Sequence, residues 1–240
     1  MDNLTEEETN RYSRQIMLDE VGFEGQIKIK QAKVLVVGAG GLGCPVLQYL
    51  GAAGVGTIGI IDFDTVEIHN LQRQILYTTE DIGKSKAITA AERIHAANPN
   101  VCCIVFNERL QESNAVNIIS QFDIIVNGPD NFATRYLVND DCVQLNKPMV
   151  YGSILNFEGQ MGVFNYKGSK NLRDIYPEPP NQEDIPKGNE IGIMGFVPGI
   201  IGLYMANATI QIVLEQYEDN KLLIFDFKRF NILKLGSNGK

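Results

Sequence analysis

Short apolar runs alternate with amphipathic stretches through the first 150 residues. Four runs rich in Val and Ile, near residues 33–38, 57–62, 101–106 and 123–127, are typical of buried strands. Helical patterns follow them near residues 42–53, 84–97, 112–120 and 131–145. Gly54 and Gly56 end the first of these helices, and Asn98 with Pro99 ends the second. This alternation predicts βαβ units and a parallel sheet.

The pattern changes beyond about residue 150. Strands are expected over residues 149–155, 160–166, 222–226 and 231–235, and they predict an added antiparallel part. The apolar stretch 191–214 lies between them, but Pro198, Gly199 and Asn207 interrupt it, so it predicts a buried core helix rather than a membrane span. We therefore expect an α/β fold, Rossmann-like, with a mostly parallel sheet and an antiparallel C-terminal extension.

The 240 residues suit a single domain with a substantial core. Within this single domain, the sequence distinguishes an N-terminal helical arm (1–30), a nucleotide-binding part (31–150) and the antiparallel part (151–240). Thr5 with Glu8 predicts a capping box that begins the arm's first helix. Residues 167–190 hold four prolines and many charges, typical of an exposed loop.

Charge and cysteine content exclude several classes of protein. Twenty-one Lys and Arg against 29 Asp and Glu give a net charge of −8, which argues against a nucleic-acid-binding surface. The chain has four scattered cysteines and no apolar N-terminal segment, so we expect a cytoplasmic protein with no membrane partner.

The most informative stretch is KVLVVGAGGLG, residues 33–43. A buried strand runs into a Gly-x-Gly-x-x-Gly turn made by Gly38, Gly40 and Gly43, and a helix follows at once. Such a turn lets the backbone approach a pyrophosphate, whose charge faces the free N–H groups of the helix. A second apolar strand ends in Asp62, an acid suited to a ribose hydroxyl. These features predict an adenine nucleotide rather than a purely structural turn.

Two cations beyond this acid favour a nucleoside triphosphate over a dinucleotide. Arg73 supplies a forked donor and Lys86 a compact charge, which suit outer phosphates that a dinucleotide does not have. Each cation alone is better explained as a solvated surface residue. Their joint occurrence after an acid-ended strand favours a phosphate role.

An ordered set of motifs over residues 10–235 resembles the ThiF/MoeB/HesA family of ubiquitin-activating-type adenylyltransferases. The motifs are RYSRQ (11–15), GAGGLG (38–43), DFD (62–64), NLQRQ (70–74), GKSKA (83–87), DNFATR (130–135) and EGQ (158–160). The resemblance implies that ATP and Mg²⁺ are used to adenylate the C-terminal Gly-Gly carboxylate of a small ubiquitin-like sulfur carrier, in molybdopterin or thiamin biosynthesis. The antiparallel part would then bind the carrier. Residues 167–190 would be either an ordinary exposed loop or, as the resemblance implies, a mobile loop that crosses over the carrier's tail.

The resemblance also implies roles for individual residues. Asn70, Arg73 and Lys86 would contact the triphosphate, Asp130 would hold Mg²⁺, and Arg14 would reach the partner's site in a homodimer. The implied catalytic residues are Arg14, Arg73, Lys86 and Asp130. The implied nucleotide-binding residues are Gly38, Gly40, Gly41, Gly43, Asp62, Asp64, Asn70, Arg73, Gln74, Lys86, Asp130 and Asn131.

Three departures from the family pattern change the expected chemistry. The positions of two Cys-x-x-Cys pairs hold no cysteine, so no zinc site is expected. Gly188 stands nearest the place of a loop cysteine, so the reaction is expected to lack a thioester step. Asn127 stands where many relatives have Asp, so the metal role is assigned to Asp130 only. Cys44 begins the first crossover helix, where we expect packing beneath the nucleotide rather than a reactive thiol.

Alternatives to this function remain open. One is adenylation of another carboxylate, on a small peptide or a modified nucleoside. Another is a nucleotide-binding scaffold without turnover, to which Asn127 and the missing cysteines lend weight. An NAD-dependent oxidoreductase is disfavoured by the cationic pair.

Overall fold

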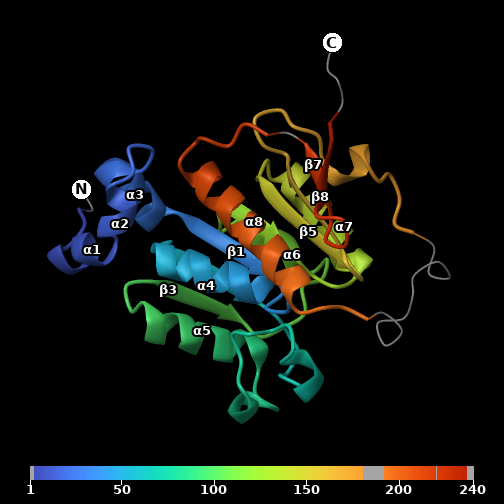
Figure 1. The fold of residues 1–240 in the computed structure, drawn as a ribbon, viewed down its shortest axis with the longest axis horizontal. Coiled ribbons are helices and arrows are strands. Elements are labelled where there is room, and N and C mark those ends of the chain that lie inside the picture. The colour runs from blue at the N-terminus through green and yellow to red at the C-terminus, as the bar shows by residue number, and fades with distance from the viewer. Residues whose placement is uncertain (1–2, 181–191, 220, 237–240) are drawn as a thin grey trace.

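A computed structural model describes residues 3–180, 192–219 and 221–236, whose fold is shown in Figure 1. They form one eight-stranded sheet in the order β3-β2-β1-β4-β5-β6-β7-β8. The strands are β1 (Lys33–Val37), β2 (Thr57–Ile61), β3 (Cys102–Phe106), β4 (Ile124–Asn127), β5 (Met149–Leu155), β6 (Glu158–Phe164), β7 (Leu222–Asp226) and β8 (Asn231–Leu235). The first five strands pair in parallel and the last three add antiparallel pairs, which confirms the predicted fold class.

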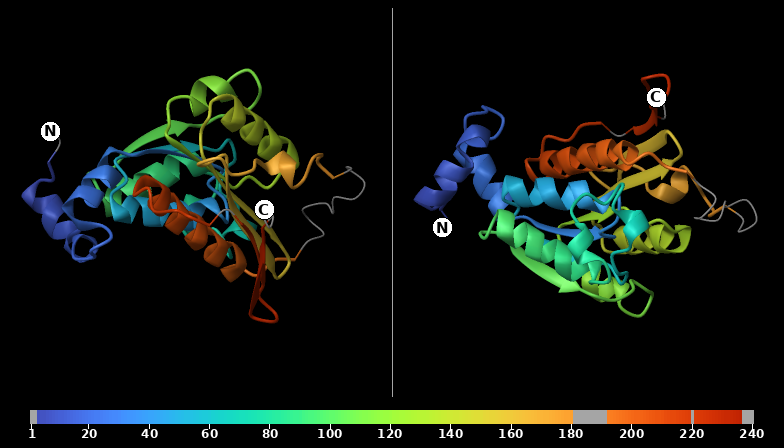
Figure 2. Two further views of the ribbon diagram at one scale, coloured as in Figure 1. Left: turned by 90° about the horizontal axis from the view of Figure 1, so that it is seen from above. Right: turned by 60° about the horizontal axis from the view of Figure 1, so that its bottom comes forward.

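Helices cover both faces of this sheet (Figure 2). They are α1 (Glu6–Arg11), α2 (Ser13–Ile16), α3 (Gly22–Gln31), α4 (Gly43–Ala53), α5 (Lys86–Ala97), α6 (Ala115–Ile119), α7 (Phe132–Gln144) and α8 (Phe196–Val213), with single 3₁₀ turns at Ile68–Asn70, Thr79–Asp81 and Leu172–Asp174. Helices α4, α5 and α8 pack on one face, and α6 and α7 on the other. Strands β1, β2 and β4 are therefore buried on both sides, which explains their continuous apolar sequence. The edge strand β3 is largely exposed, although its apolar run predicted a buried strand, because it has a neighbouring strand on one side only.

Local signals place most helix ends where they were predicted. Thr5 and Glu8 form the expected capping box, and Gly54 ends α4 in the left-handed conformation with φ +85°. Ser85 accepts a hydrogen bond from the Ile88 N–H, so α5 begins at Lys86, two residues later than expected. Helix α6 is shorter than the predicted stretch 112–120.

Helix α8 is long and apolar enough to pass a test for a membrane span, and it is the only such helix among residues 3–180, 192–219 and 221–236. It packs against α4, β5 and β6. The contact with β5 is close, because a Cβ placed on Gly152 would lie 2.3 Å from the Met205 Sδ. The helix is thus part of the core, as the interrupted apolar stretch predicted.

The N-terminal arm packs at the end of the sheet where the parallel strands begin. Gln15 and Gln26 both donate to the carbonyl of Ala53, the last residue of α4. Lys30 forms an ion pair of 2.8 Å with the buried Glu8, which fastens α1 to α3. The arm therefore lies opposite the strand ends that carry the glycine turn.

Candidate nucleotide-binding site

The glycine turn joins β1 to α4 in a conformation that depends on its glycines. Gly38 has φ +91°, in the left-handed region that favours glycine. A Cβ on Gly43 would lie 1.9 Å from the Gly38 carbonyl oxygen, so only glycine fits there. Helix α4 consequently begins directly above the end of β1. Its Cys44 N–H already donates to the Gly40 carbonyl at 2.8 Å and Pro45 has no N–H, so an anion at this end of the helix would meet the N–H groups of the turn.

Asp62 follows β2 and fastens the turn. Its Oδ2 accepts a hydrogen bond of 2.8 Å from the Ala39 N–H, and its Oδ1 accepts one of 2.8 Å from the Asp64 N–H. Burial raises the pKa of Asp62, although these two N–H groups and Lys86 oppose the rise. Each carboxylate oxygen keeps a further lone pair, so the ribose role predicted for Asp62 is compatible with these contacts.

Lys86 lies at the start of α5 and faces the same pocket. Its side chain is 7% exposed, and its Nζ lies 3.2 Å from the Asp64 Oδ2. The Tyr77 hydroxyl lies 2.8 Å from the Ala39 carbonyl oxygen and 3.2 Å from that of Lys86. Tyr77 therefore connects the glycine turn to the backbone that carries the lysine.

Arg73 and Gln74 approach from the segment between β2 and α5. Arg73 Nη1 donates to the His69 carbonyl at 2.9 Å, and no carboxylate among the described residues forms an ion pair with it. Gln74 is 4% exposed, and its Oε1 has no hydrogen-bond partner in the part of the chain that the structure describes. An unsatisfied buried amide oxygen beside a pocket is typical of a group that a ligand or a water completes.

The loop after β4 contributes Asp130 and Asn131. Asp130 is exposed and accepts no hydrogen bond from the described residues, whereas Asn131 caps α7 by accepting from the Thr134 N–H at 2.8 Å. Asn127 is fully buried and donates to the Arg135 carbonyl at 3.1 Å. Its Oδ1 has no hydrogen-bond partner among the described residues. The assignment of the metal role to Asp130 alone stays a prediction.

One pocket collects most of the predicted residues at the carboxyl ends of β1, β2 and β4. Those that line it are Gly38, Gly40, Gly41, Asp62, Asp64, Arg73, Gln74, Lys86, Asp130 and Asn131. Three predicted residues do not line it. Gly43 lies beneath the turn, Asn70 is buried with its Oδ1 accepting from the Glu67 N–H, and Arg14 is exposed on the distant arm. The roles of these three residues stay predictions.

The sequence did not single out two arginines that also line this pocket. Arg109 stacks on Phe63 with 3.8 Å from its Cζ to the ring centroid. Arg135 projects from the first turn of α7 and belongs to the DNFATR motif. The motif is a signal for Arg135, but no local pattern marks Arg109, which reaches the pocket only through the order of strands in the sheet.

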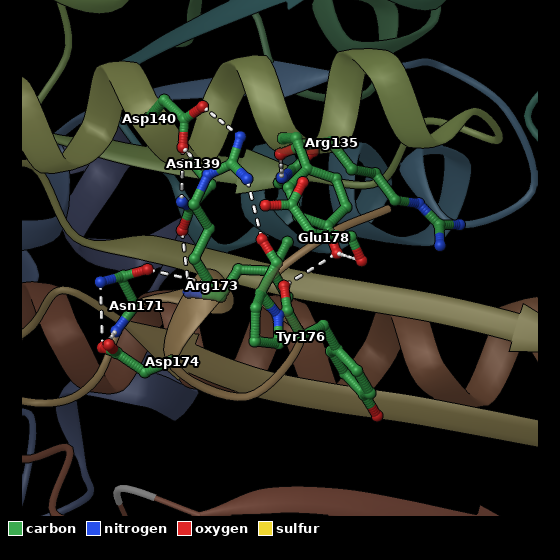
Figure 3. Close-up of polar contacts among 12 residues, drawn as sticks. Arg135, Asn139, Asp140, Asn171, Arg173, Asp174, Tyr176 and Glu178 are labelled. Carbon is green, nitrogen blue, oxygen red and sulfur yellow. Dashed lines mark hydrogen bonds and ion pairs between the residues drawn. The ribbon is translucent and has the colours of Figure 1, made fainter. Parts of the chain in front are cut away.

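A second polar cluster lies further along α7, and Figure 3 shows its contacts. Asp140 receives two hydrogen bonds of 2.7 Å from Arg173, one to each carboxylate oxygen. Asn139 accepts from the Leu172 N–H at 2.8 Å, and the Tyr136 hydroxyl lies 2.9 Å from the carbonyls of residues 176 and 178. We call this cluster the α7 clasp, because it fastens residues 171–178 to the helix.

The expected absence of zinc and of a loop nucleophile stays a prediction. The described residues contain no group of three or more His, Cys, Asp or Glu that could hold a metal. Gly188 lies outside the described residues. The α7 clasp occupies the first of the two places where zinc cysteines are missing, at residues 170–174.

Comparison with known proteins identifies the family of the chain. The model of the ThiF family matches residues 12–238. The chain is 49% identical over 210 residues to a probable molybdopterin-synthase adenylyltransferase of Porphyra purpurea, covering 87% of this chain and 55% of that protein. It is 46% identical over 215 residues to a sulfur carrier protein adenylyltransferase of Thermus thermophilus, covering 88% and 79%. The chain spans about half the length of several such relatives, as in the Porphyra protein.

Solved structures show the same fold at lower identity. A crystal structure of PaaA superposes with a TM-score of 0.83 at 22% identity, covering 98% of this chain and 75% of that one. E. coli MccB, solved with AMPCPP and MccA, gives 0.82 at 23% identity, covering 95% and 71%. These structures show the fold, and the match of the family model over residues 12–238 shows that the chain belongs to the ThiF family.

Proposed function

We propose that this member of the ThiF family is an ATP-dependent adenylyltransferase that activates the C-terminal carboxylate of a small ubiquitin-like sulfur carrier. One observation carries the proposal: two cations, Arg73 and Lys86, share a pocket with a glycine turn and with the exposed carboxylate of Asp130. The names of the Porphyra and Thermus relatives support this activity and this class of substrate.

The reaction needs charge stabilisation more than acid–base chemistry. A carboxylate oxygen attacks the α-phosphorus of ATP, a phosphorus–oxygen bond forms, and the bond to pyrophosphate breaks. The carboxylate is already ionised at neutral pH, so no general base is required. Negative charge shifts to the leaving pyrophosphate, where Arg73 and Lys86 stabilise it. Lys86 pairs with Asp64 at 3.2 Å, so this carboxylate holds the lysine at the pocket before the phosphates bind.

Asp130 is proposed as the protein ligand of Mg²⁺. A magnesium ion in such enzymes is held by one or two carboxylates together with substrate phosphates. A single exposed carboxylate beside the glycine turn fits this donor set. The ion would neutralise charge on the triphosphate.

The carrier is proposed to dock on the antiparallel part, and the active form to be a homodimer. Strand β8 is exposed along its whole length and presents Ile232, Leu233 and Leu235, which are 45%, 55% and 51% exposed. Apolar side chains on an exposed strand are typical of an interaction surface. The arm that carries Arg14 lies at the far end of the sheet, so Arg14 would serve a partner's site.

We further propose that the reaction stops at the acyl-adenylate. Burial raises the pKa of Cys44 to about 12, so the thiol beneath the glycine turn stays protonated and unreactive. Burial also raises the pKa of Cys142. All four cysteines are free thiols, which agrees with a cytoplasmic location.

Exchange of labelled pyrophosphate into ATP tests the function. The full chain is incubated with ATP, Mg²⁺ and each of a panel of ubiquitin-like carriers ending in Gly-Gly. Exchange that requires one carrier and its free carboxylate supports the proposal. ATP binding without exchange for any carrier, peptide or nucleoside carboxylate would instead identify a scaffold, and exchange only with a small carboxylate would identify a different acceptor.

A further inference from the structure

Arg135 is a buried cation that has no acidic partner among the residues that the structure describes. It is 6% exposed, yet it lines the nucleotide pocket. Its Nε donates to the Pro129 carbonyl at 3.0 Å and its Nη1 to the Ser153 hydroxyl at 2.8 Å. No carboxylate forms an ion pair with it in the ranges 3–180, 192–219 and 221–236.

The donors of this guanidinium are only partly used. A guanidinium has five N–H groups. The two hydrogen bonds to Pro129 and Ser153 leave three, on Nη1 and Nη2, for another group. The rings of Phe132 and Tyr151 lie 5.2 and 5.9 Å from Cζ and provide some compensation. A buried charge without a counter-charge is costly, so the arrangement favours an anion bound from the pocket.

The position of Arg135 in the sheet indicates which anion this is. Lys86 and Asp64 lie beyond β2, and the glycine turn lies beyond β1. Arg135 extends from α7, after β4, to Ser153 on β5, which is the strand that joins the parallel and antiparallel parts. A tail that enters across β5 and β6 therefore meets Arg135 before it meets the triphosphate.

We infer that Arg135 binds the C-terminal carboxylate of the acceptor and orients it toward the α-phosphorus. This inference rests on the proposed function. A forked guanidinium and a carboxylate form paired, charge-assisted hydrogen bonds, which fix both position and direction. Ser153 and the Pro129 carbonyl hold the guanidinium in place. After attack, one carboxylate oxygen is bonded to phosphorus and pyrophosphate has left. The acyl group beside Arg135 is then no longer an anion, so Arg135 binds the product less tightly than the acceptor.

The test compares acceptor forms that differ only in the charge that Arg135 is said to recognise. The carrier that supports exchange is prepared with a free C-terminal carboxylate and with a C-terminal amide. Their dissociation constants are measured on wild-type protein and on Arg135→Gln, at a saturating concentration of a non-hydrolysable ATP analogue. The wild type is expected to prefer the acid by about 10- to 100-fold, the range for a charged hydrogen-bonded pair. Arg135→Gln is expected to lose this preference.

Controls separate recognition from folding and from phosphate binding. Arg135→Lys retains the charge and keeps part of the preference, and it replaces Arg135→Gln if that variant does not fold. Arg173→Gln removes a paired arginine of the α7 clasp, outside the pocket, and is expected to keep the wild-type preference. A full acid preference in Arg135→Gln, with or without weaker binding of the ATP analogue, overturns the inference while leaving the proposed function intact. If no carrier supports exchange by the wild type, the proposed function fails and this inference fails with it.

Discussion

Helix α7 carries two arginine clusters with opposite electrostatics. In the α7 clasp, Arg173 meets both oxygens of Asp140 at 2.7 Å, and each charge has its partner. Arg135, less than two turns toward the N-terminus, has no acidic partner among the described residues, and its guanidinium points away from the clasp (Figure 3). The clasp is half-exposed and joins two segments of the chain, whereas Arg135 is buried beside a pocket.

The presence or absence of an acidic partner separates cations that stabilise the fold from cations that are available to bind a ligand. The same distinction holds at α5. Arg93 and Lys84 both pair with the buried Asp81; burial alone would raise its pKa, but the hydrogen bonds from Arg93, Thr78 and Lys84 hold it well below its usual range. Arg73, on the segment before α5, has only a carbonyl partner within the described part of the chain. Substitution of unpaired cations should therefore affect activity, and substitution of paired cations should affect stability.

Arg73→Ala should have the largest effect. Loss of an arginine that stabilises the negative charge of a phosphoryl group in the transition state reduces the rate by about 10³-fold or more. Carrier-dependent pyrophosphate exchange measures this loss, and ATP affinity is expected to fall much less. Arg173→Met is the matched control, since it removes a paired arginine outside the pocket. If exchange by Arg73→Ala equalled that of the wild type, Arg73 would not act on the phosphates.

Asp130→Asn should have the second-largest effect. It should reduce pyrophosphate exchange, and excess Mg²⁺ should restore part of the lost activity. A neutral amide is a weaker ligand for Mg²⁺, so half-maximal exchange should need about 10- to 100-fold more Mg²⁺. Titration of exchange with MgCl₂ measures the shift. Asp123→Asn makes the same change at the other end of β4, where the carboxylate accepts from the Lys33 N–H, and should leave the titration unchanged. An unshifted curve for Asp130→Asn would point to another metal ligand.

Mixing two inactive variants tests whether the arm completes a partner's site. Arg14→Ala and Arg73→Ala chains, mixed in equal amounts, should recover about a quarter of wild-type exchange, because half of the dimers are mixed and each contains one intact site. Native mass spectrometry verifies subunit exchange. No recovery in verified mixed dimers would show that each chain builds its own site.

The sequence predicts elements whose signals are local and misses residues whose role is set by tertiary placement. The glycine turn, the Thr5 capping box and the apolar strands are visible because spacing and residue type determine them. The ribose role of Asp62 stays a prediction, and the sequence did not indicate the hydrogen bond that its Oδ2 accepts from the Ala39 N–H, a contact between residues 23 positions apart. The DNFATR motif includes Arg135, but a role for its charge follows only from its burial and from the absence of an acidic partner in the described structure.

The α7 clasp should show the smallest effect, and on stability rather than activity. The half-exposed pair of Asp140 and Arg173 is expected to contribute up to about 1 kcal/mol to the free energy of unfolding, despite its two-bond geometry. Asp140→Asn, Arg173→Met and the double variant, compared by urea unfolding, measure the coupling between the two side chains.

The pH dependence of this coupling shows whether it comes from the charges of Asp140 and Arg173. The hydrogen bonds from Arg173 hold the pKa of Asp140 below its ordinary value. The stabilisation is therefore complete above the unfolded-state pKa of about 4 and is lost as the pH falls through the lowered pKa of the folded protein. The Cζ of Arg173 lies 4.8 Å from the centroid of the Tyr136 ring. If the coupling were equal at pH 7 and at pH values below the folded pKa of Asp140, this packing, and not charge, would hold residues 171–178 on α7. Coupling that disappears at low pH, with exchange at pH 7 unchanged in both single variants, would assign the paired cluster to the fold and leave the unpaired arginines to the reaction.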